Sequence, residues 1–561
     1  MRICFRVFIF ILLISQSLYA GLLRDEYRNL PPKNRPQYQV EIDLDFENRS
    51  YKGVAQIRFE YPFSENKGVV LRLFANSGAE GEKSLSITSI KLDGKEIEFE
   101  YKDNTSVEIR GEFRAKKIYT LSIEFEANMP RISDEDSDIF LTSLKQLLGL
   151  SGQGASENNY GVFGCSSSVC NMAAPIPSLA KFYGNNWLRA EMNGIGDYQR
   201  GDFADYKVNI ISDASVTVVN NGIIRKREIM SDGRIKWSFE AESVNDIIFE
   251  ASTNFDYERR EADGILYSFY SCSEVSHKLA RLSIDIASEA VNFFSRYYAK
   301  YPYNELKIVV VPMTGGAGGV EFPALITVGD FLYKEIEGRE TDGRFVSIDL
   351  LTQMFEFVIV HEVAHQWFAT LIPSDSRKEP YLDEGAASFS AYLYFIHKYG
   401  KDEANKILEN QIRLNYVMMR LLGYKDQPIN TPIEKYENMF QYAGIIYGKA
   451  PLFFVKLREL IGEQRFGFLI SKWVKERSFK DTNINQLISM FKFNEPQKAP
   501  QIDALYKRWF EGVYGDADIG KGSLRDLLKY VTDGKDLDLD IDLDSLKDWL
   551  ENTFDMFRQY R

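Results

Sequence analysis

Two histidines, His361 and His365, stand one helical turn apart and enclose Glu362 within the mostly apolar stretch 355–371. Because residues i and i+4 leave the same face of a helix, both imidazoles can hold one small cation. Glu362 lies about 100° around the helix from His361, where it can reach a water molecule beside that cation. The alternative is a buried helix whose two histidines are hydrogen-bonded core residues. The chain has only four histidines, so this arrangement favours the metal site.

A catalytic zinc site needs a third protein ligand and keeps one position for water. Glu384 is the candidate, because it follows His365 by 19 positions in a segment whose alanines allow close helix packing. The sequence therefore predicts one Zn²⁺ held by His361, His365 and Glu384. Zinc of this kind activates water, and Glu362 is the predicted general base for hydrolysis of an amide or ester. His277 and His397 are expected to be structural or surface residues.

The first third of the chain shows the period of half-buried strands. Apolar and polar residues alternate there, and Asp93-Gly94 between apolar runs is typical of a hairpin turn. The alternating runs are 38–46, 57–61, 119–125 and 206–210. We expect a large antiparallel β domain, interrupted by a Ser/Gly-rich long loop around Ser151 to Ser168.

Helical periodicity replaces this pattern in the second half. Apolar residues recur on one helix face from Leu279 to Phe294, and helical patterns dominate from Ile348 onward. Leu306 to Val311 is a short apolar run typical of a buried strand. Because 561 residues are too many for one ordinary domain, several domains are expected.

The charge of the chain argues against a nucleic-acid partner. The formal net charge is -13, and no long run of lysine or arginine is present. A nucleic-acid-binding surface needs a basic patch, whereas an acidic balance favours solubility and says little about a substrate. The oligomeric state is left open by the sequence.

Residues 1–20 have the pattern of a secretory signal peptide, with a basic start, an apolar run at 7–14 and a small residue, Ala20, at the end. The run is short for a membrane anchor, which is the alternative, and no other segment reaches roughly 18 apolar residues. We therefore expect an exported protein, periplasmic or secreted, without an integral membrane span after signal cleavage. A disulfide between Cys165 and Cys170 would be compatible with such a compartment.

The His-Glu-x-x-His motif followed by Glu384 in Leu-Asp-Glu-Gly resembles the gluzincin aminopeptidases, the family of aminopeptidase N and leukotriene hydrolase. The likeness covers most of the chain. It implies an N-terminal antiparallel β saddle domain followed by a thermolysin-like α+β, mainly helical, catalytic domain. The expected division is a signal peptide at 1–20, the β domain at 21–258, the zinc peptidase domain at 259–514 and a short tail at 515–561. The implied activity is zinc-dependent removal of N-terminal residues from peptides.

Two more segments can be compared with the family. Its Gly-Ala-Met-Glu-Asn segment corresponds to 318–322, where the Met and Asn are replaced. The resemblance implies that Gly318 and Gly319 let a substrate backbone approach an edge strand, and that Glu321 binds the free α-amine. Tyr447 matches the family's hydrogen-bond donor to the tetrahedral oxyanion, a donor that typically contributes about 3 kcal/mol.

One family element is not recognisable. Relatives carry a second amine-binding segment from the β domain, and Gln153 and Glu157 are the only weak candidates for it. Two alternatives to an aminopeptidase therefore stay open. One is a zinc peptidase of altered specificity that does not require a free N-terminus, and the other is a non-catalytic peptide-binding module on a peptidase scaffold.

Overall fold

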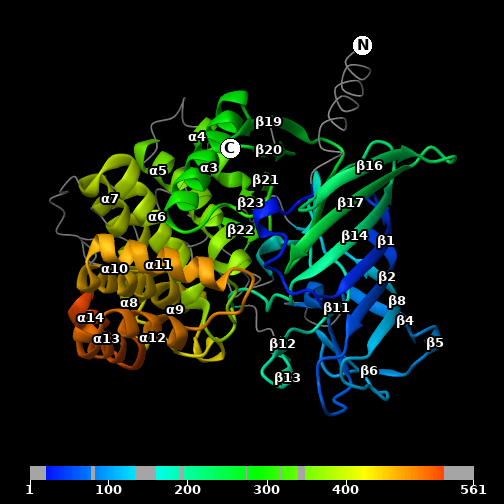
Figure 1. Ribbon diagram of the computed structural model, residues 1–561. Helices are drawn as coiled ribbons and strands as arrows, with labels where there is room; N and C mark the ends of the chain where they lie inside the picture. Colours follow the sequence, from blue (N-terminus) through cyan, green and yellow to red (C-terminus); the bar gives the residue numbers. More distant parts are fainter. Residues whose placement is uncertain are drawn as a thin grey trace.

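The computed structural model describes residues 21–77, 83–132, 159–189, 195–272, 275–314, 317–338 and 348–522. The predicted signal peptide at 1–20, Gln153, Glu157 and the part of the predicted tail after residue 522 lie outside the described residues. The β-rich first part of the chain stands beside a mainly helical second part, as predicted (Figure 1).

The β-rich part is built on an eight-stranded sheet, and alternation of burial along its strands explains the sequence pattern. In the strand Gln37–Asp45, every second side chain is buried. Most neighbours are antiparallel, but the first strand pairs in parallel with Ala204–Ser212, which comes more than 150 residues later. The strand order is β16 (Ile223–Ile229), β17 (Ile235–Val244), β14 (Ala204–Ser212), β1 (Gln37–Asp45), β2 (Ser50–Glu60), β8 (Ile118–Asn128), β4 (Leu85–Leu92) and β5 (Lys95–Glu96). Asp93 and Gly94 both have positive φ at the predicted hairpin turn.

Three smaller sheets complete this part. One has the order β15 (Thr217–Asn220), β18 (Ile248–Ser252), β10 (Val169–Ala173) and β9 (Phe163–Cys165). A second has the order β11 (Ser178–Leu179), β3 (Val69–Arg72), β7 (Ser106–Ile109) and β6 (Phe99–Tyr101), and β12 (Phe182–Tyr183) pairs with β13 (Asn186–Trp187).

The described end of the predicted long loop is not a loop throughout. Residues 163–165 form β9, which pairs with β10, and a Cys165–Cys170 disulfide joins the two strands. The loop prediction was wrong there because glycine and serine suit a tight hairpin as well as a loop.

The second part of the chain begins with a five-stranded sheet. Its order is β19 (Asp256–Ala262), β20 (Ile265–Ser271), β21 (Glu305–Val311), β23 (Leu325–Gly329) and β22 (Gly319–Phe322). β21 is buried along its whole length, as the apolar run predicts. β22 is an edge strand, so one side of its backbone is open to other partners.

Helices cover this sheet and fill the rest of the domain. They are α3 (His277–Tyr297), α4 (Asp330–Gly338), α5 (Ile348–Ala364), α6 (Glu384–Tyr399), α7 (Lys401–Ile407), α8 (Leu414–Leu421), α9 (Met439–Ala443), α10 (Ala450–Ile461), α11 (Glu463–Arg477), α12 (Ile484–Asn494), α13 (Ala499–Tyr506) and α14 (Gly515–Asp518). α5 packs against β22 and also against α6. Residues of the edge strand and of these two helices therefore meet at one place. Within the described residues, no helix combines the length and apolar character needed to cross a bilayer.

Candidate metal centre and active site

The three predicted ligands meet between α5 and α6. His361 Nε2 lies 3.0 Å from His365 Nε2 and 3.1 Å from Glu384 Oε2, and His365 Nε2 lies 3.3 Å from the same oxygen. Tetrahedral ligands about 2.0–2.1 Å from a zinc ion are separated by roughly 3.3 Å. All three side chains are buried. The geometry predicted from the i, i+4 spacing and the distant glutamate therefore exists in the folded chain.

Hydrogen bonds on the far side of each ring orient the two histidines. His365 Nδ1 lies 2.8 Å from Asp383 Oδ1 and 3.0 Å from the Phe368 carbonyl oxygen, and His361 Nδ1 lies 3.2 Å from Ser388 Oγ. With acceptors at Nδ1, each ring keeps its proton there and presents a bare Nε2. Two such nitrogens and a carboxylate oxygen then face one another without a donor between them. This donor set fits a zinc ion.

Glu362 lies on the same helix and packs against Gly319 of the edge strand. A Cβ at residue 319 would come within 2.6 Å of Glu362 Cγ, so glycine there makes room for the side chain. Glu362 Oε2 is buried and has no hydrogen-bond partner among the described residues. Burial raises the pKa of Glu362 well above its ordinary value, with further contributions from Glu321 and Glu384 and an opposing one from His365. A general base works best when its pKa lies near the working pH.

Tyr447 comes from a π-helical turn, Gly444–Lys449, between α9 and α10. Its ring centroid is 6.0 Å from that of His361 and 6.0 Å from that of Tyr442. Burial raises the pKa of Tyr447 well above its usual value, and the charge of Glu384 adds to the rise. The phenol therefore keeps its proton and can act as a hydrogen-bond donor beside the predicted metal.

A loop from the β-rich part, residues 195–200, also reaches the site. It brings Asp197, whose carboxylate lies within 4.8 Å of those of Glu321 and Asp383. Arg377 Nη1 holds the loop by donating a hydrogen bond of 2.5 Å to the Ile195 carbonyl oxygen. The sequence-based prediction missed Asp197 and Arg200 and named Gln153 and Glu157 instead. The only local signal for them is a charged pair in a glycine-bearing loop, Gly196-Asp-Tyr-Gln-Arg-Gly201.

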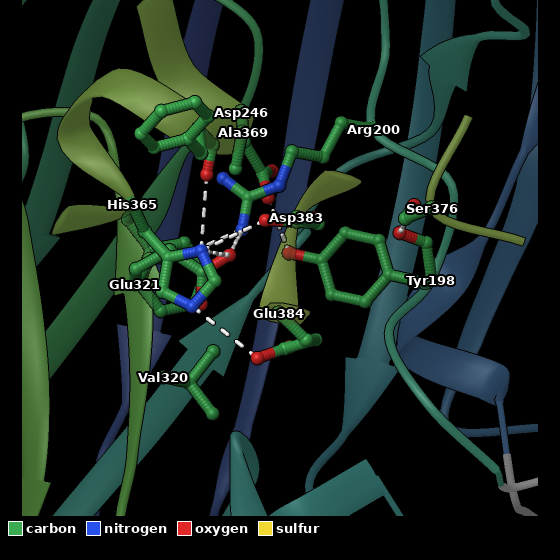
Figure 2. Close-up of polar contacts among 12 residues, drawn as sticks. Tyr198, Arg200, Asp246, Val320, Glu321, His365, Ala369, Ser376, Asp383 and Glu384 are labelled. Atoms are coloured by element: carbon green, nitrogen blue, oxygen red, sulfur yellow. Dashed lines mark hydrogen bonds and ion pairs between the residues drawn. The ribbon is translucent and has the colours of Figure 1, made fainter. Parts of the chain in front are cut away.

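Arg200 forms a buried ion pair with Glu321, the predicted amine-binding residue (Figure 2). The Arg200 atom in this pair, Nη2, also donates a hydrogen bond of 2.9 Å to the Glu321 main-chain oxygen. Burial raises the pKa of Glu321, and the charges of His365 and Arg200 act against that rise. Burial likewise opposes the charge of Arg200, but Glu321 and Asp246 outweigh it and raise the pKa of Arg200. The carboxylate of Glu321 is therefore already paired within the protein.

The two other histidines lie outside the site. His277 is at the start of α3, where its Nδ1 lies 2.6 Å from Glu258 Oε1 at the surface. His397 stacks on Phe293 with ring centroids 4.8 Å apart. Both positions fit the surface and structural roles expected of them.

Comparison with known proteins finds a peptidase domain in the part of the chain that holds this arrangement. Residues 282–509 match the Peptidase family M1 domain. Aminopeptidase 2 of Candida albicans is 22% identical over 484 residues, which cover 84% of this chain and 47% of that protein. Residues 282–509 are therefore an M1 peptidase domain. The match to this domain implies a zinc cofactor, which the donor set described above would hold.

Other relatives match the sequence of this chain over part of their own length. Aminopeptidase N of Haemonchus contortus is 23% identical over 307 residues, or 51% of this chain and 29% of that protein. The chain spans under half the length of the curated relatives it matches. The solved M1 zinc metallopeptidase from Deinococcus radiodurans aligns with a TM-score of 0.55 at 14% identity, over 89% of this chain and 97% of that one. This likeness confirms the predicted fold class, a β-rich domain followed by a mainly helical catalytic domain.

Proposed function

We propose that this protein, with its M1 peptidase domain, is a zinc aminopeptidase that removes N-terminal residues from peptides with a single Zn²⁺. The observation that supports this best is the buried triangle of His361 Nε2, His365 Nε2 and Glu384 Oε2, with edges of 3.0, 3.1 and 3.3 Å. The relatives named as aminopeptidases support the same activity.

Zinc, when bound, supplies a Lewis acid that polarises the scissile carbonyl and makes water more acidic. The chain's own residues do the rest. Glu362 accepts a proton from the attacking water and delivers it to the leaving amine. Tyr447 donates a hydrogen bond to the carbonyl oxygen as negative charge develops on it. Asp383 and Ser388 keep the two imidazoles in the orientation and tautomer that binding of zinc requires.

Recognition of the N-terminus falls to the carboxylates beside the ligands. One carboxylate oxygen each of Asp197, Glu321 and Asp383 lies within 4.8 Å of the other two. A substrate ammonium placed among them would form charge-assisted hydrogen bonds, which are roughly twice as strong as neutral ones. Since the ligands, the base and the donor are all assembled, a binding module without catalysis is not favoured.

The test is a panel of fluorogenic aminoacyl amides, each with a free and an N-acetylated amine, measured with and without a chelator. We expect hydrolysis of the free-amine substrates only, loss of activity on chelation and recovery on addition of Zn²⁺. Equal cleavage of free and acetylated substrates would exclude an exopeptidase. Purified, zinc-loaded protein that binds peptides tightly but hydrolyses none would favour the binding module.

We propose further that the protein is exported after removal of a signal peptide ending near Ala20. The Cys165–Cys170 disulfide supports this, because such bonds persist mainly in oxidising compartments. Determination of the N-terminal residue of the mature protein, together with fractionation of the producing cells, tests the proposal. An N-terminus at Met1 in a cytosolic fraction would contradict it.

A further inference from the structure

One nitrogen of Arg200 holds both the side chain and the main chain of Glu321. Arg200 Nη2 donates to Glu321 Oε1 and, at 2.9 Å, to the main-chain oxygen of the same residue. Glu321 belongs to β22, the edge strand of the catalytic sheet, whereas Arg200 comes from the loop that leads into β14. The β-rich domain therefore covers the edge strand at the residue expected to meet the substrate amine.

This contact is deeply buried. Only 7% of the Arg200 side chain and 3% of the Glu321 side chain are exposed. Asp246 raises the pKa of Arg200 together with Glu321, and Tyr198 donates its hydroxyl proton to Asp246 at 2.5 Å (Figure 2). Arg200 thus feels the charge of a second buried carboxylate besides that of Glu321, the one it contacts. A guanidinium fixed in this way is a rigid part of the wall of the site.

An edge strand can bind an extended peptide through its free main-chain groups. A substrate chain that extended along β22 past the position of the N-terminal residue would need two things at Glu321. It would need the space that the Arg200 side chain fills, and it would need the main-chain oxygen to which Arg200 donates. An ammonium group ends the chain at that point and needs neither. Its charge would be met by the carboxylates of Asp197 and Glu321, whose oxygen atoms lie within 4.8 Å of each other.

We propose that Arg200 closes the substrate site at Glu321 and thereby makes a free N-terminus a condition for binding. This rests on the proposed aminopeptidase function and adds to it a positioning residue from the β-rich domain. Arg200 acts through Glu321 and through the space it fills, without contact with the reacting atoms.

Three hydroxamates that share one zinc-binding group separate closure from attraction of the amine. They are phenylalanine hydroxamate, 3-phenylpropanohydroxamate, which lacks the amine, and N-acetylphenylalanine hydroxamate. Their dissociation constants for zinc-loaded protein are measured by titration calorimetry, so turnover is not needed. In the wild type we expect the free-amine compound to bind about tenfold or more tighter than the compound without an amine, and the acetylated compound to bind most weakly.

In Arg200→Ala the affinity for the acetylated compound should rise about tenfold or more relative to the affinity for the compound without an amine, because the space beyond Glu321 opens. Arg200→Lys should restore most of the exclusion, since lysine fills the same path. Arg200→Gln serves the same comparison if R200A loses thermal stability. Glu321→Gln keeps the main-chain acceptor for Arg200, so it should lose the preference for the amine and still exclude the acetylated compound.

The matched control is Arg35→Ala, which removes another arginine–carboxylate contact of the β-rich domain, 2.7 Å from Asp205, away from the site. It should leave all three affinities unchanged. If R200A binds the acetylated compound as weakly as the wild type does, relative to the compound without an amine, the inference is overturned. A wild type that hydrolyses no aminoacyl amide and binds the free-amine compound no better than the others overturns the proposed function instead.

Discussion

Gly319 in the edge strand and Glu362 in α5 are in such close contact that a methyl group at residue 319 would lie 2.6 Å from Glu362 Cγ and 2.7 Å from Oε1. Real Cβ atoms essentially never come so near to another heavy atom. The glycine therefore determines where the carboxylate of the proposed base can lie. This reason adds to the one expected from the sequence, which was close approach of a substrate backbone.

Gly319→Ala should lower kcat by about 10²-fold, because misplacement of a catalytic group by about 1 Å costs that much. Zinc content, measured by atomic absorption, should stay at the wild-type level, since the three atoms nearest to the new methyl group all belong to Glu362, which is not a ligand. The control is Gly467→Ala in α11, whose new methyl group would lie 3.3 Å from Tyr297 Oη. Equal losses of kcat in both variants would show that Glu362 is not the group displaced.

Asp383→Asn tests the orientation of His365, whose Nδ1 lies 2.8 Å from the Asp383 carboxylate. Loss of such a partner typically weakens metal binding by 10–100-fold. We expect a decrease of that size in zinc affinity, measured by competition with a chromophoric chelator. Asp375→Asn is a suitable control, because the Asp375 carboxylate accepts from the main-chain N–H groups of Arg377 and Lys378 and pairs with the Lys378 side chain, all in its own turn. An unchanged zinc affinity in D383N would assign Asp383 another role.

Much of the metal centre follows from helix geometry and could be predicted from residues alone. The i, i+4 spacing of His361 and His365 places both rings on one face of α5 whatever surrounds the helix. Glu384 joins the two histidines because its helix, α6, packs directly against α5. The strands with alternating burial, such as β1, were predictable for the same reason, since a period of two is a local property.

The amine end of the site could not be predicted in this way. The loop that brings Asp197 and Arg200 to Glu321 is held by Arg377, which lies 182 residues from its partner Ile195. No local periodicity encodes a contact of that separation. The parallel pairing of β1 with β14 has the same character and was missed in favour of a purely antiparallel domain.

Tyr447→Phe should lower kcat by roughly 10²- to 10³-fold with little change in KM, because the lost hydrogen bond is made mainly in the transition state. Tyr436→Phe is the matched control. Its hydroxyl is buried without a hydrogen-bond partner among the described residues, so removal should leave activity unchanged. Steady-state kinetics with one aminoacyl amide checks both variants. A Y447F enzyme with wild-type kcat would remove Tyr447 from the mechanism.

Glu362→Gln should keep the zinc and lose turnover by at least about 10²- to 10⁴-fold, because the amide cannot accept the proton of the attacking water. Glu356→Gln on the same helix is the control: its carboxylate bonds to Tyr394, Lys398 and Tyr399, away from the ligands. Zinc content and thermal unfolding are measured beside kcat for both proteins. Substantial activity in a zinc-loaded E362Q would mean that another group takes the proton. The nearest such group is Glu321, which with Glu362 and His365 forms a cluster of atoms within 4.8 Å of one another. In that event the double variant E362Q/E321Q should lose the remaining turnover, whereas E321Q alone should mainly raise KM for free-amine substrates.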